Sequence, residues 1–317
     1  MKILANDGIA PIGKENLEKA GYEVITETVA QDDLINAINE NNYVGLLVRS
    51  ATKVRENLID ACPGLKLIGR GGVGMDNIDV EYARNKGLSV INTPAASSQS
   101  VAEQVMAHLF SASRSIYDSN RQMPVSGASD FKVLKKKYGK GVELRGKTIG
   151  IIGFGRIGQS LAKYALGCGM KVIAFDPFMD GATIDVQVAD QTVSVTIKTI
   201  ALDDLLAQAD YISMHVPMPA DGKALIGSNE FTKMKDGVII ANAARGGVID
   251  EDALIANLNN GKVAHAALDV FTNEPTPRED LLNHPKISLT PHTGAATGEA
   301  QDRIGEELAS QIIEILG

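Results

Sequence analysis

The middle of the chain reads Thr148-Ile149-Gly150-Ile151-Ile152-Gly153-Phe154-Gly155-Arg156-Ile157-Gly158. Its aliphatic first half predicts a buried β-strand, and its second half matches the G-x-G-x-x-G pattern that joins a strand to a helix in dinucleotide-binding folds. The first glycine permits a tight turn, the second lets a pyrophosphate approach the backbone, and the third lets helix and strand pack closely. Free N–H groups and the helix dipole favour anions at such a helix N-terminus. We therefore assign cofactor binding to Gly153, Gly155, Arg156, Ile157 and Gly158.

An acidic residue after the next predicted strand supports a dinucleotide site. The strand Lys171–Phe175 is followed by Asp176, eighteen residues beyond Gly158. A carboxylate at this position can accept hydrogen bonds from both ribose hydroxyls, and it repels a 2′-phosphate. The next residues, Pro177-Phe178-Met179, offer no cation that could bind such a phosphate. The sequence therefore predicts NAD rather than NADP as the cofactor.

A second glycine cluster shows that the pattern alone is weak. Gly69-Arg70-Gly71-Gly72-Val73-Gly74 also fits the spacing and also follows a predicted strand. The next strand, however, leads into Asn92-Thr93-Pro94 and not into an acid. From its residues alone this cluster is a tight turn or a cofactor loop, and the missing acid disfavours the cofactor.

Short aliphatic runs alternate with helical segments, which predicts α/β architecture with parallel sheets. Strands are expected in the first third at Lys2–Ala5, Glu23–Thr26, Val44–Val48, Lys66–Ile68 and Ser89–Ile91. Ser100 and Glu103 form a capping-box pattern at the start of a long helix. A second series of strands is expected near Thr148–Ile152, Lys171–Phe175, Tyr211–Val216, Val238–Ala241, Ala264–Val270 and Ile287–Thr290. Residues 183–199 alternate like a hairpin insertion, to which we assign no function.

The composition limits the class of protein. A chain of 317 residues is about twice a typical domain, so two domains are expected. The net charge of −8 disfavours binding to nucleic acid or anionic membranes, and aromatic residues make up only 4 %. No run is long and apolar enough for a membrane span, and the first residues turn polar too early for a signal peptide. Cys62 and Cys168 form no C-x-x-C pair and no Cys/His cluster, so we expect a cytoplasmic protein without a metal site.

A dehydrogenase that oxidises an alcohol beside a carboxylate needs a base, a group that orients the base, and a cation for the carboxylate. Imidazole suits the first role near neutral pH. His215 and His292 both follow predicted strands, at the edge where open α/β sheets bind ligands. The residues alone do not decide between them, although the rigid turn Thr290–Gly294 favours His292. The remaining histidines are expected to be structural: His108, His265 and His284.

Candidates for the other two roles also lie after predicted strands. Asp269 and Glu274 are both placed to orient the base. Arg245 lies among small residues and offers the planar fork that a carboxylate accepts. From the sequence alone, a surface ion pair for Arg245 and a helix-start acid for Glu274 remain alternatives.

Several segments, in the same order along the chain, resemble the NAD-dependent D-2-hydroxyacid dehydrogenases. They cover nearly the whole length and are Val48–Val54, Gly69–Asp79, Gly153–Gly158 with Asp176, Asn242–Glu251, Leu268–Pro275 and Pro291–Ala295. The resemblance implies two Rossmann-like, doubly wound parallel-sheet domains with a cleft between them. It also implies a discontinuous substrate domain of residues 1–95 and 291–317 around an NAD-binding domain of residues 96–290.

By this resemblance, Arg245, Glu274 and His292 occupy the family's catalytic positions. His292 would accept the proton of the C2 hydroxyl, and Glu274 would hold the imidazole and favour its charged form. Arg245 would bind the carboxylate and the carbonyl oxygen. The resemblance adds His215 and Asp269 to the cofactor site. It assigns the second glycine cluster and its neighbours to the substrate, namely Arg49, Ser50, Arg70, Gly71, Gly72 and Val73.

The arginines indicate which reaction of the family to expect. Arg49 and Arg70 match positions that members acting on phosphoglycerate use around the substrate. We therefore expect NAD-dependent oxidation of 3-phospho-D-glycerate to 3-phosphohydroxypyruvate, the first step of phosphorylated serine biosynthesis. A glyoxylate/hydroxypyruvate reductase or a D-lactate dehydrogenase is the alternative within the family. An NAD-sensing binding protein on the same scaffold is the alternative that is not an enzyme.

The resemblance further implies a homodimer formed through the helix and arm of residues 100–145. The basic part of this arm, Lys132–Lys140, is either a solvated surface or part of a neighbouring substrate site. The sequence does not decide whether Lys135, Lys136 or Lys137 reaches such a site. No regulatory domain is expected beyond the final helix Glu299–Leu316, so feedback by serine through such a domain is not expected.

Overall fold

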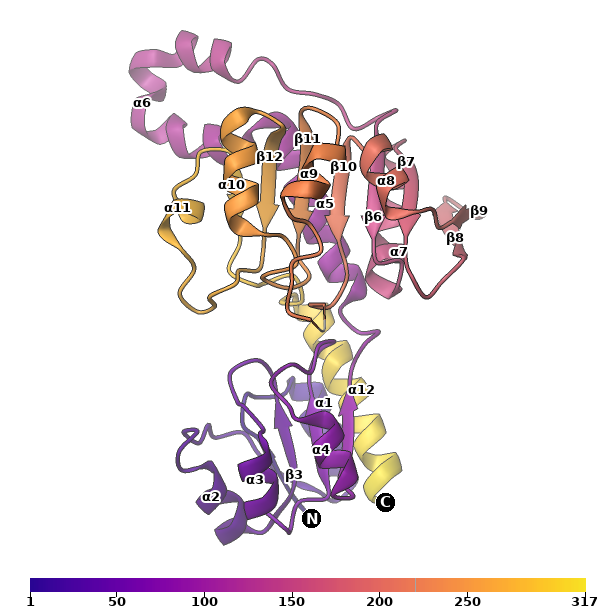
Figure 1. Ribbon diagram of the computed structural model, residues 1–317. Helices are drawn as coiled ribbons and strands as arrows, with labels where there is room; N and C mark the ends of the chain where they lie inside the picture. The colour runs from indigo at the N-terminus through magenta and orange to yellow at the C-terminus, as the bar shows by residue number, and fades with distance from the viewer. Residues whose placement is uncertain (220) are drawn as a thin grey trace. The chain divides into compact units, whose positions relative to one another are not determined.

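The computed structural model of the protein describes residues 1–219 and 221–317. The chain forms two compact units, one of Met1–Ser100 with Ala295–Gly317 and the other of Val101–Gly294. The sequence-based boundaries are 95/96 and 290/291, and the units divide at 100/101 and 294/295. Each unit contains a parallel sheet with helices, which confirms the predicted α/β class (Figure 1).

The first unit is built on a parallel sheet in the order β2-β1-β3-β4-β5. All strands predicted for this part of the chain are present, as β1 (Lys2–Ala5), β2 (Glu23–Ile25), β3 (Tyr43–Val48), β4 (Leu67–Arg70) and β5 (Ser89–Asn92). The helices of this unit are α1 (Pro11–Lys19), α2 (Leu34–Asn41), α3 (Glu56–Ala61), α4 (Val80–Asn85) and α12 (Gly298–Leu316).

Both faces of this sheet are buried, because neighbouring strand residues point to opposite sides. Leu46 packs in the core with residues of α2 and α3, whereas Leu47 packs with residues of α1 and α12. Helices α1 and α12 approach so closely that a Cβ on Gly13 would lie 2.6 Å from the carbonyl oxygen of Gly305. The C-terminal helix is therefore an integral layer of the first unit, although most of that unit's sequence lies near the N-terminus.

The second unit has a six-stranded parallel sheet in the order β13-β12-β11-β10-β6-β7. All six strands predicted for it are present, as β6 (Thr148–Ile152), β7 (Lys171–Phe175), β10 (Tyr211–Met214), β11 (Val238–Asn242), β12 (Val263–Leu268) and β13 (Ile287–Leu289). The connecting helices are α7 (Arg156–Gly167), α8 (Leu202–Gln208), α9 (Ser228–Lys233), α10 (Glu251–Asn260) and α11 (Glu279–Leu282). Residues of α7 pack into one core, and residues of α8, α9 and α10 into the other.

Two long helices, α5 (Ser98–Arg114) and α6 (Ile116–Lys137), precede the second sheet. The predicted helix start at Ser100 is wrong, because α5 begins at Ser98. The Ser98 N–H donates to the Ala95 carbonyl oxygen at 3.4 Å, so a turn already continues into the helix before the capping-box pattern. Helix α6 bends at Asp130, whose backbone is not helical. None of the helices in the described part of the chain combines a membrane-spanning length with sufficient apolar character.

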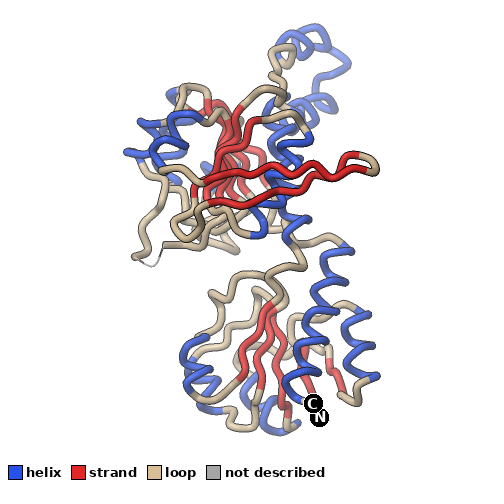
Figure 2. The backbone as a smooth tube through the Cα atoms, turned by 90° about the vertical axis from the view of Figure 1, so that its right-hand side faces the viewer, coloured by secondary structure: helices blue, strands red, loops and turns tan. Residues whose placement is uncertain are grey.

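The strands β8 (Gly181–Val188) and β9 (Gln191–Lys198) pair antiparallel, which confirms the hairpin predicted for residues 183–199. Ile184 and Ile197 are buried in the core of the second unit, whereas Val188 and Val193 near the turn are about half exposed. Figure 2 shows that the far end of this hairpin projects away from the unit.

The strand order reverses beside the first strand of each sheet. β2 and β3 flank β1 in the first unit, and β7 and β10 flank β6 in the second. Open α/β sheets bind ligands at the carboxyl ends of the strands where the order reverses. The residues that follow β1 and β3, and those that follow β6 and β10, are therefore the first places to examine for a site.

Candidate active site

The glycine turn after β6 contains two glycines that the fold requires and one that it does not. Gly153 has φ +92°, and a Cβ there would lie 2.4 Å from the His215 carbonyl oxygen. A Cβ on Gly158 would lie 2.3 Å from the Gly153 carbonyl oxygen. A Cβ on Gly155, in contrast, would meet no atom within 4 Å. Open space at the start of α7 is what a pyrophosphate needs to approach the N–H groups of Arg156 and Ile157.

Asp176 supports this turn from the end of β7. One carboxylate oxygen accepts the Phe154 N–H at 2.8 Å, and the other accepts the Phe178 N–H at 2.9 Å. Each oxygen has a further lone pair, so the same carboxylate can still accept the two ribose hydroxyls of NAD. The residues present therefore fit the predicted cofactor on this side of the sheet.

His215, after β10, is a neutral imidazole near pH 7. Its Nε2 lies 2.9 Å from the Ser213 hydroxyl oxygen, and its Nδ1 is buried without a partner among the described residues. Burial lowers the pKa of His215 to about 4. A base of this strength is poorly matched to proton transfer at neutral pH. His215 follows β10, the strand beside β6, and its predicted contact with the cofactor stays a prediction.

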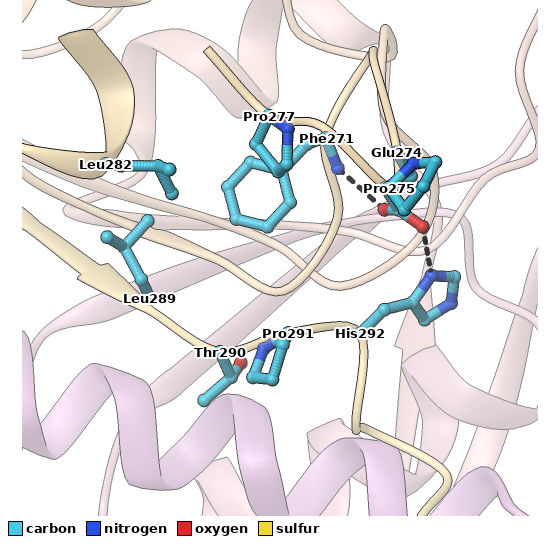
Figure 3. A pocket seen from close by; sticks show the side chains of 9 residues that line it. All are labelled: Phe271, Glu274, Pro275, Pro277, Leu282, Leu289, Thr290, Pro291 and His292. Carbon is cyan, nitrogen blue, oxygen red and sulfur yellow. Dashed lines mark hydrogen bonds and ion pairs between the residues drawn. The ribbon is translucent and has the colours of Figure 1, made fainter. Parts of the chain in front are cut away.

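His292 differs from His215 because it has a carboxylate partner. Its Nδ1 lies 2.7 Å from Oε2 of Glu274, and Oε1 of Glu274 accepts the Phe271 N–H at 2.9 Å. Figure 3 shows the imidazole directed at this carboxylate. Because Nδ1 faces Glu274, Nε2 is the ring nitrogen that remains for a substrate. The structure thus brings together the predicted base and one of its two candidate orienting groups.

A cavity of about 420 Å³ lies beside the His292–Glu274 pair. Figure 3 shows apolar side chains grouped on one side of the pair. The cavity is lined by Phe271, Glu274, Pro275, Pro277, Leu282, Leu289, Thr290, Pro291 and His292.

Arg245 follows β11 in a turn that is fixed by its own strand end. The Asn242 side chain donates to the Arg245 carbonyl oxygen at 2.8 Å and accepts the Ala244 N–H at 3.0 Å. A Cβ on Gly246 would lie 2.0 Å from the Phe271 carbonyl oxygen. The Arg245 turn therefore packs on the backbone whose next residues carry Glu274. Sequence reasoning did not single out Asn242, although a polar residue at the end of a strand was a usable signal.

Asp269 is not beside the imidazole of His292. Its side chain is only 2 % exposed and accepts the backbone N–H groups of Thr293 and Gly294, both at 2.9 Å. The second candidate for orienting the base thus holds the turn that carries the base, while Glu274 contacts the base itself. The predicted contact of Asp269 with the cofactor stays a prediction.

In the second unit, the candidate residues follow neighbouring strands. Their order across the sheet is His292 after β13, Glu274 after β12, Arg245 after β11, His215 after β10, the glycine turn after β6 and Asp176 after β7. Since all six strands are parallel, these residues lie at the same carboxyl edge. In the described part of the chain, no group of three or more His, Cys, Asp or Glu side chains is placed to hold a metal ion.

The first unit places the two predicted substrate arginines on adjacent strands. Arg49 directly follows β3, and Arg70 is the last residue of β4, in register with Val48. One Asp7 carboxylate oxygen accepts the Arg49 N–H at 2.6 Å, which fixes the backbone there. Nη2 of Arg70 donates to the Ser50 hydroxyl at 3.3 Å. Sequence reasoning did not single out Asp7, although it follows β1 at the carboxyl edge.

The loop after β4 completes this arrangement in the first unit. Gly72 has φ +142°, and a Cβ there would lie 2.0 Å from Nη1 of Arg70, so the guanidinium crosses directly over this glycine. Arg49 and Gly71 also line a cavity of about 420 Å³ together with residues of α12 and of the β1–α1 turn. Ser50 and Gly72 thus lie beside Arg70, and Gly71 lies beside Arg49. The predicted contacts of Arg49, Ser50, Arg70, Gly71, Gly72 and Val73 with a substrate anion stay a prediction.

Comparison with known proteins identifies the family of the chain. Residues 106–294 match the family model described as D-isomer specific 2-hydroxyacid dehydrogenase, NAD binding domain. The chain is 43 % identical over 314 residues to a hydroxypyruvate reductase of Thermotoga maritima, covering 97 % of this chain and 96 % of that protein. It is 39 % identical over 317 residues to a D-3-phosphoglycerate dehydrogenase of Archaeoglobus fulgidus, covering 99 % of this chain but 57 % of that protein.

A solved structure extends the agreement to the whole chain. The NAD⁺-bound 3-phosphoglycerate dehydrogenase of Entamoeba histolytica superposes with a TM-score of 0.78 at 30 % identity. The match covers 100 % of this chain and 95 % of that one. The predicted Rossmann-like fold and the predicted cofactor NAD are both confirmed by these similarities.

Replacing Gly155 by alanine should separate cofactor binding from folding. The added methyl group meets no protein atom within 4 Å, so the thermal midpoint should not fall. The same methyl group occupies the approach of the pyrophosphate, so NADH affinity should fall by about tenfold or more. Gly167→Ala, on the same helix and equally uncrowded, should bind NADH normally. Fluorescence titration with NADH measures both, and unchanged affinity in Gly155→Ala would contradict this cofactor site.

The depressed pKa of His215 predicts a pH-dependent contribution to stability. The unfolded residue titrates near 6.5 and the folded one near 4, so the unfolded chain takes up the proton first as the pH falls. Stability is therefore fully present above about pH 6.5 and is lost toward pH 4, by about 3 kcal/mol for this residue. Urea denaturation of the wild type and His215→Asn between pH 7 and 4.5 should show their difference shrinking. A constant difference across this range would refute the assignment.

Proposed function

The chain belongs to the D-isomer specific 2-hydroxyacid dehydrogenase family, and from this membership we propose that it oxidises 3-phospho-D-glycerate to 3-phosphohydroxypyruvate. The family membership makes it an NAD-dependent dehydrogenase of 2-hydroxy acids. The phosphorylated substrate, and with it the first step of phosphorylated serine biosynthesis, is the specific part of the proposal.

The pair of arginines in the first unit is the observation that carries this proposal. Arg49 and Arg70 lie at the ends of adjacent strands, beside the Gly71–Val73 loop. A 2-hydroxy acid needs one cation for its carboxylate, and Arg245 is assigned to that role. Further guanidinium groups are suited to a phosphate, because the planar fork forms paired hydrogen bonds to its oxygens. We rank Arg49 as the phosphate contact.

The proposed chemistry uses the His292–Glu274 pair. Nε2 of His292 accepts the proton of the C2 hydroxyl while the C2 hydrogen leaves as hydride, so that the C–O single bond becomes a carbonyl. When bound, NAD⁺ would be held by the Gly153–Gly158 turn and Asp176 and would accept this hydride. Glu274 fixes the ring through Nδ1 and stabilises the imidazolium that forms. Arg245 binds the substrate carboxylate and polarises the oxygen at C2. In this scheme residues 1–95 and 291–317 serve the substrate, and residues 96–290 serve NAD.

A hydroxypyruvate reductase is the second candidate. The relative with that name is 43 % identical and matches over 96 % of its own length, whereas the phosphoglycerate dehydrogenase matches over only 57 %. Hydroxypyruvate has the same carboxylate and carbonyl as the phosphorylated substrate but lacks the phosphate. The two candidate functions therefore differ at Arg49, because only the phosphorylated substrate has a phosphate for this side chain to bind.

Initial rates of NADH oxidation with several 2-oxo acids test the substrate assignment. The panel is phosphohydroxypyruvate, hydroxypyruvate, glyoxylate, pyruvate and 2-oxoglutarate, and we expect phosphohydroxypyruvate to give the highest kcat/KM. Arg49→Ala should lower kcat/KM about 100-fold for phosphohydroxypyruvate and much less for hydroxypyruvate. Arg84→Ala, an exposed arginine of the same unit, should change neither value. If hydroxypyruvate is the better substrate of the wild type, the phosphoglycerate assignment is wrong and the second candidate stands.

His292→Asn tests the assignment of the base. Asparagine removes the titratable nitrogen and keeps a polar side chain, so turnover should fall by about 10²-fold to 10⁴-fold. NADH affinity should stay near the wild-type value, because the Gly153–Gly158 turn is untouched. His215→Asn provides the comparison, and near-normal turnover in His292→Asn would exclude His292 as the base.

We also propose that the protein is a homodimer formed through α5 and α6. Large apolar side chains are exposed on this part of the chain, and Val125 is 80 % exposed. The others are Phe110, Ile116, Met123, Phe131 and Val133. Exposed apolar patches of this kind mark protein interfaces. The proposed protein partner is a second copy of this chain. The proposed small-molecule ligand is an anionic hydroxy acid.

Light scattering of the purified protein should give twice the mass of one chain. Val125→Asp together with Phe131→Asp should shift the mass toward the monomer, because two charges would enter an apolar interface. Phe178→Asp is the matched control, because Phe178 is 93 % exposed but lies outside α5 and α6. A wild-type monomer would refute the dimer.

A further inference from the structure

A buried polar cluster lies behind the turn that carries His292. Its centre is the Asp269 carboxylate, which accepts four hydrogen bonds. Oδ1 accepts the Thr290 hydroxyl at 2.6 Å, the Gln104 side-chain amide at 2.8 Å and the Thr293 N–H at 2.9 Å. Oδ2 accepts the Gly294 N–H at 2.9 Å. A buried carboxylate is tolerated when its lone pairs are satisfied in this way.

Helix α5 supplies two members of this cluster. The Gln104 amide donates to the Thr290 hydroxyl oxygen at 2.6 Å as well as to Asp269. The ring of His108, one turn further along α5, lies between two strand hydroxyls. Its Nδ1 is 2.9 Å from the Ser288 oxygen, and its Nε2 is 3.0 Å from the Thr290 oxygen.

The donors and acceptors fix the direction of the hydrogen bonds that link Asp269, Thr290, His108 and Ser288. Asp269 accepts only, so the single Thr290 hydroxyl proton is committed to it. The Thr290 oxygen must then accept from His108, which places the imidazole proton on Nε2. Nδ1 of His108 is left as an acceptor for the Ser288 hydroxyl. Burial lowers the pKa of His108, in agreement with a neutral ring that donates on one side and accepts on the other.

This chain of bonds holds the His292 turn on both sides. Thr290 precedes the base by two residues, and Thr293 and Gly294 follow it directly. His292 itself has φ +54°, a left-handed conformation that is unfavourable for a residue with a Cβ. Such a conformation persists when the surrounding structure over-determines it. Figure 3 shows Thr290, Pro291 and His292 on this one turn, with the ring directed at Glu274.

We propose that Gln104 and His108 of α5 are positioning residues for His292. The proposal rests on the proposed role of His292 as the base. Neither side chain touches the imidazole of His292. Both act through Thr290, and Gln104 also through Asp269, to keep the turn in the conformation that directs Nδ1 at Glu274 and Nε2 at the substrate. Displacement of a base by about 1 Å is enough to lower a rate about 100-fold.

Two nearly isosteric apolar substitutions, His108→Leu and Gln104→Met, test the proposal. With the best 2-oxo acid of the panel, kcat should fall by about 10-fold to 100-fold in each. The dissociation constant of NADH should stay within about threefold of the wild-type value, because the Gly153–Gly158 turn follows β6 whereas Thr290 follows β13. The deuterium isotope effect from NADH labelled at the transferred hydrogen should rise, because a misplaced base makes the chemical step limiting. A merely structural role would leave this isotope effect unchanged.

His108→Gln is the rescue variant. A glutamine amide can donate to Thr290 and accept from Ser288, so kcat should return to within about threefold of the wild type. Rescue that restores the thermal midpoint but not kcat would overturn the proposal.

Ser113→Ala provides the matched control on the same helix. Ser113 is buried, and its hydroxyl lies 2.9 Å from the Tyr211 hydroxyl in a part of the sheet that does not carry His292. This variant should lose stability comparable to that of His108→Leu while keeping kcat and the isotope effect. Equal losses of kcat in both variants would show that α5 acts only through stability. The His292→Asn measurement tests the role of His292 as the base separately from the positioning role of Gln104 and His108. Full activity in His292→Asn would show that His292 is not the base, whatever the result at His108.

Discussion

The parallel direction of the strands is the constraint on which the candidate site depends. Six strands of the second unit run the same way, so the residues that follow them meet at one edge, although up to 139 residues separate Gly153 from His292. The proposed base His292, its carboxylate partner Glu274, Arg245 and the glycine turn each come from a different strand end. The crossover helices that make parallel pairing possible also bury both faces of the sheet, which explains the nearly continuous aliphatic strands.

Glycines that share one spacing pattern have different roles, which depend on the atoms that lie close to each of them. Gly153 and Gly158 are required because a side chain would collide with backbone atoms, whereas Gly155 keeps a space open. In the first unit, Gly72 is required for another reason, because the Arg70 guanidinium crosses over it. The same pattern therefore serves a dinucleotide in one unit and, in our proposal, a substrate anion in the other. In our proposal the surrounding charge decides which ligand binds, because Asp176 lies beside one loop and Arg49 and Arg70 lie beside the other.

Two acidic residues that the sequence left as equal candidates have different environments. Glu274 is partly exposed and contacts the His292 ring, whereas Asp269 is buried and collects hydrogen bonds from the turn that carries the ring. The two histidines after strands separate in a similar way. His215 is buried beside a serine hydroxyl and has a pKa of about 4, while His292 faces a carboxylate. In our proposal His292 transfers the proton and Glu274 orients it, whereas Asp269 supports the turn that carries His292.

The sequence by itself determined the α/β class, the positions of the strands, the hairpin and the preference for NAD, because these depend on local periodicity and on motifs within a few dozen residues. It misplaced the start of α5, where a turn after Pro94 outweighs the capping-box pattern at Ser100. Only the tertiary structure decided which acid contacts the base, and it alone revealed Gln104 and His108 behind the His292 turn. Their partners lie 165 to 186 residues away along the chain, so no local pattern could indicate contacts that the packing of α5 on the sheet creates.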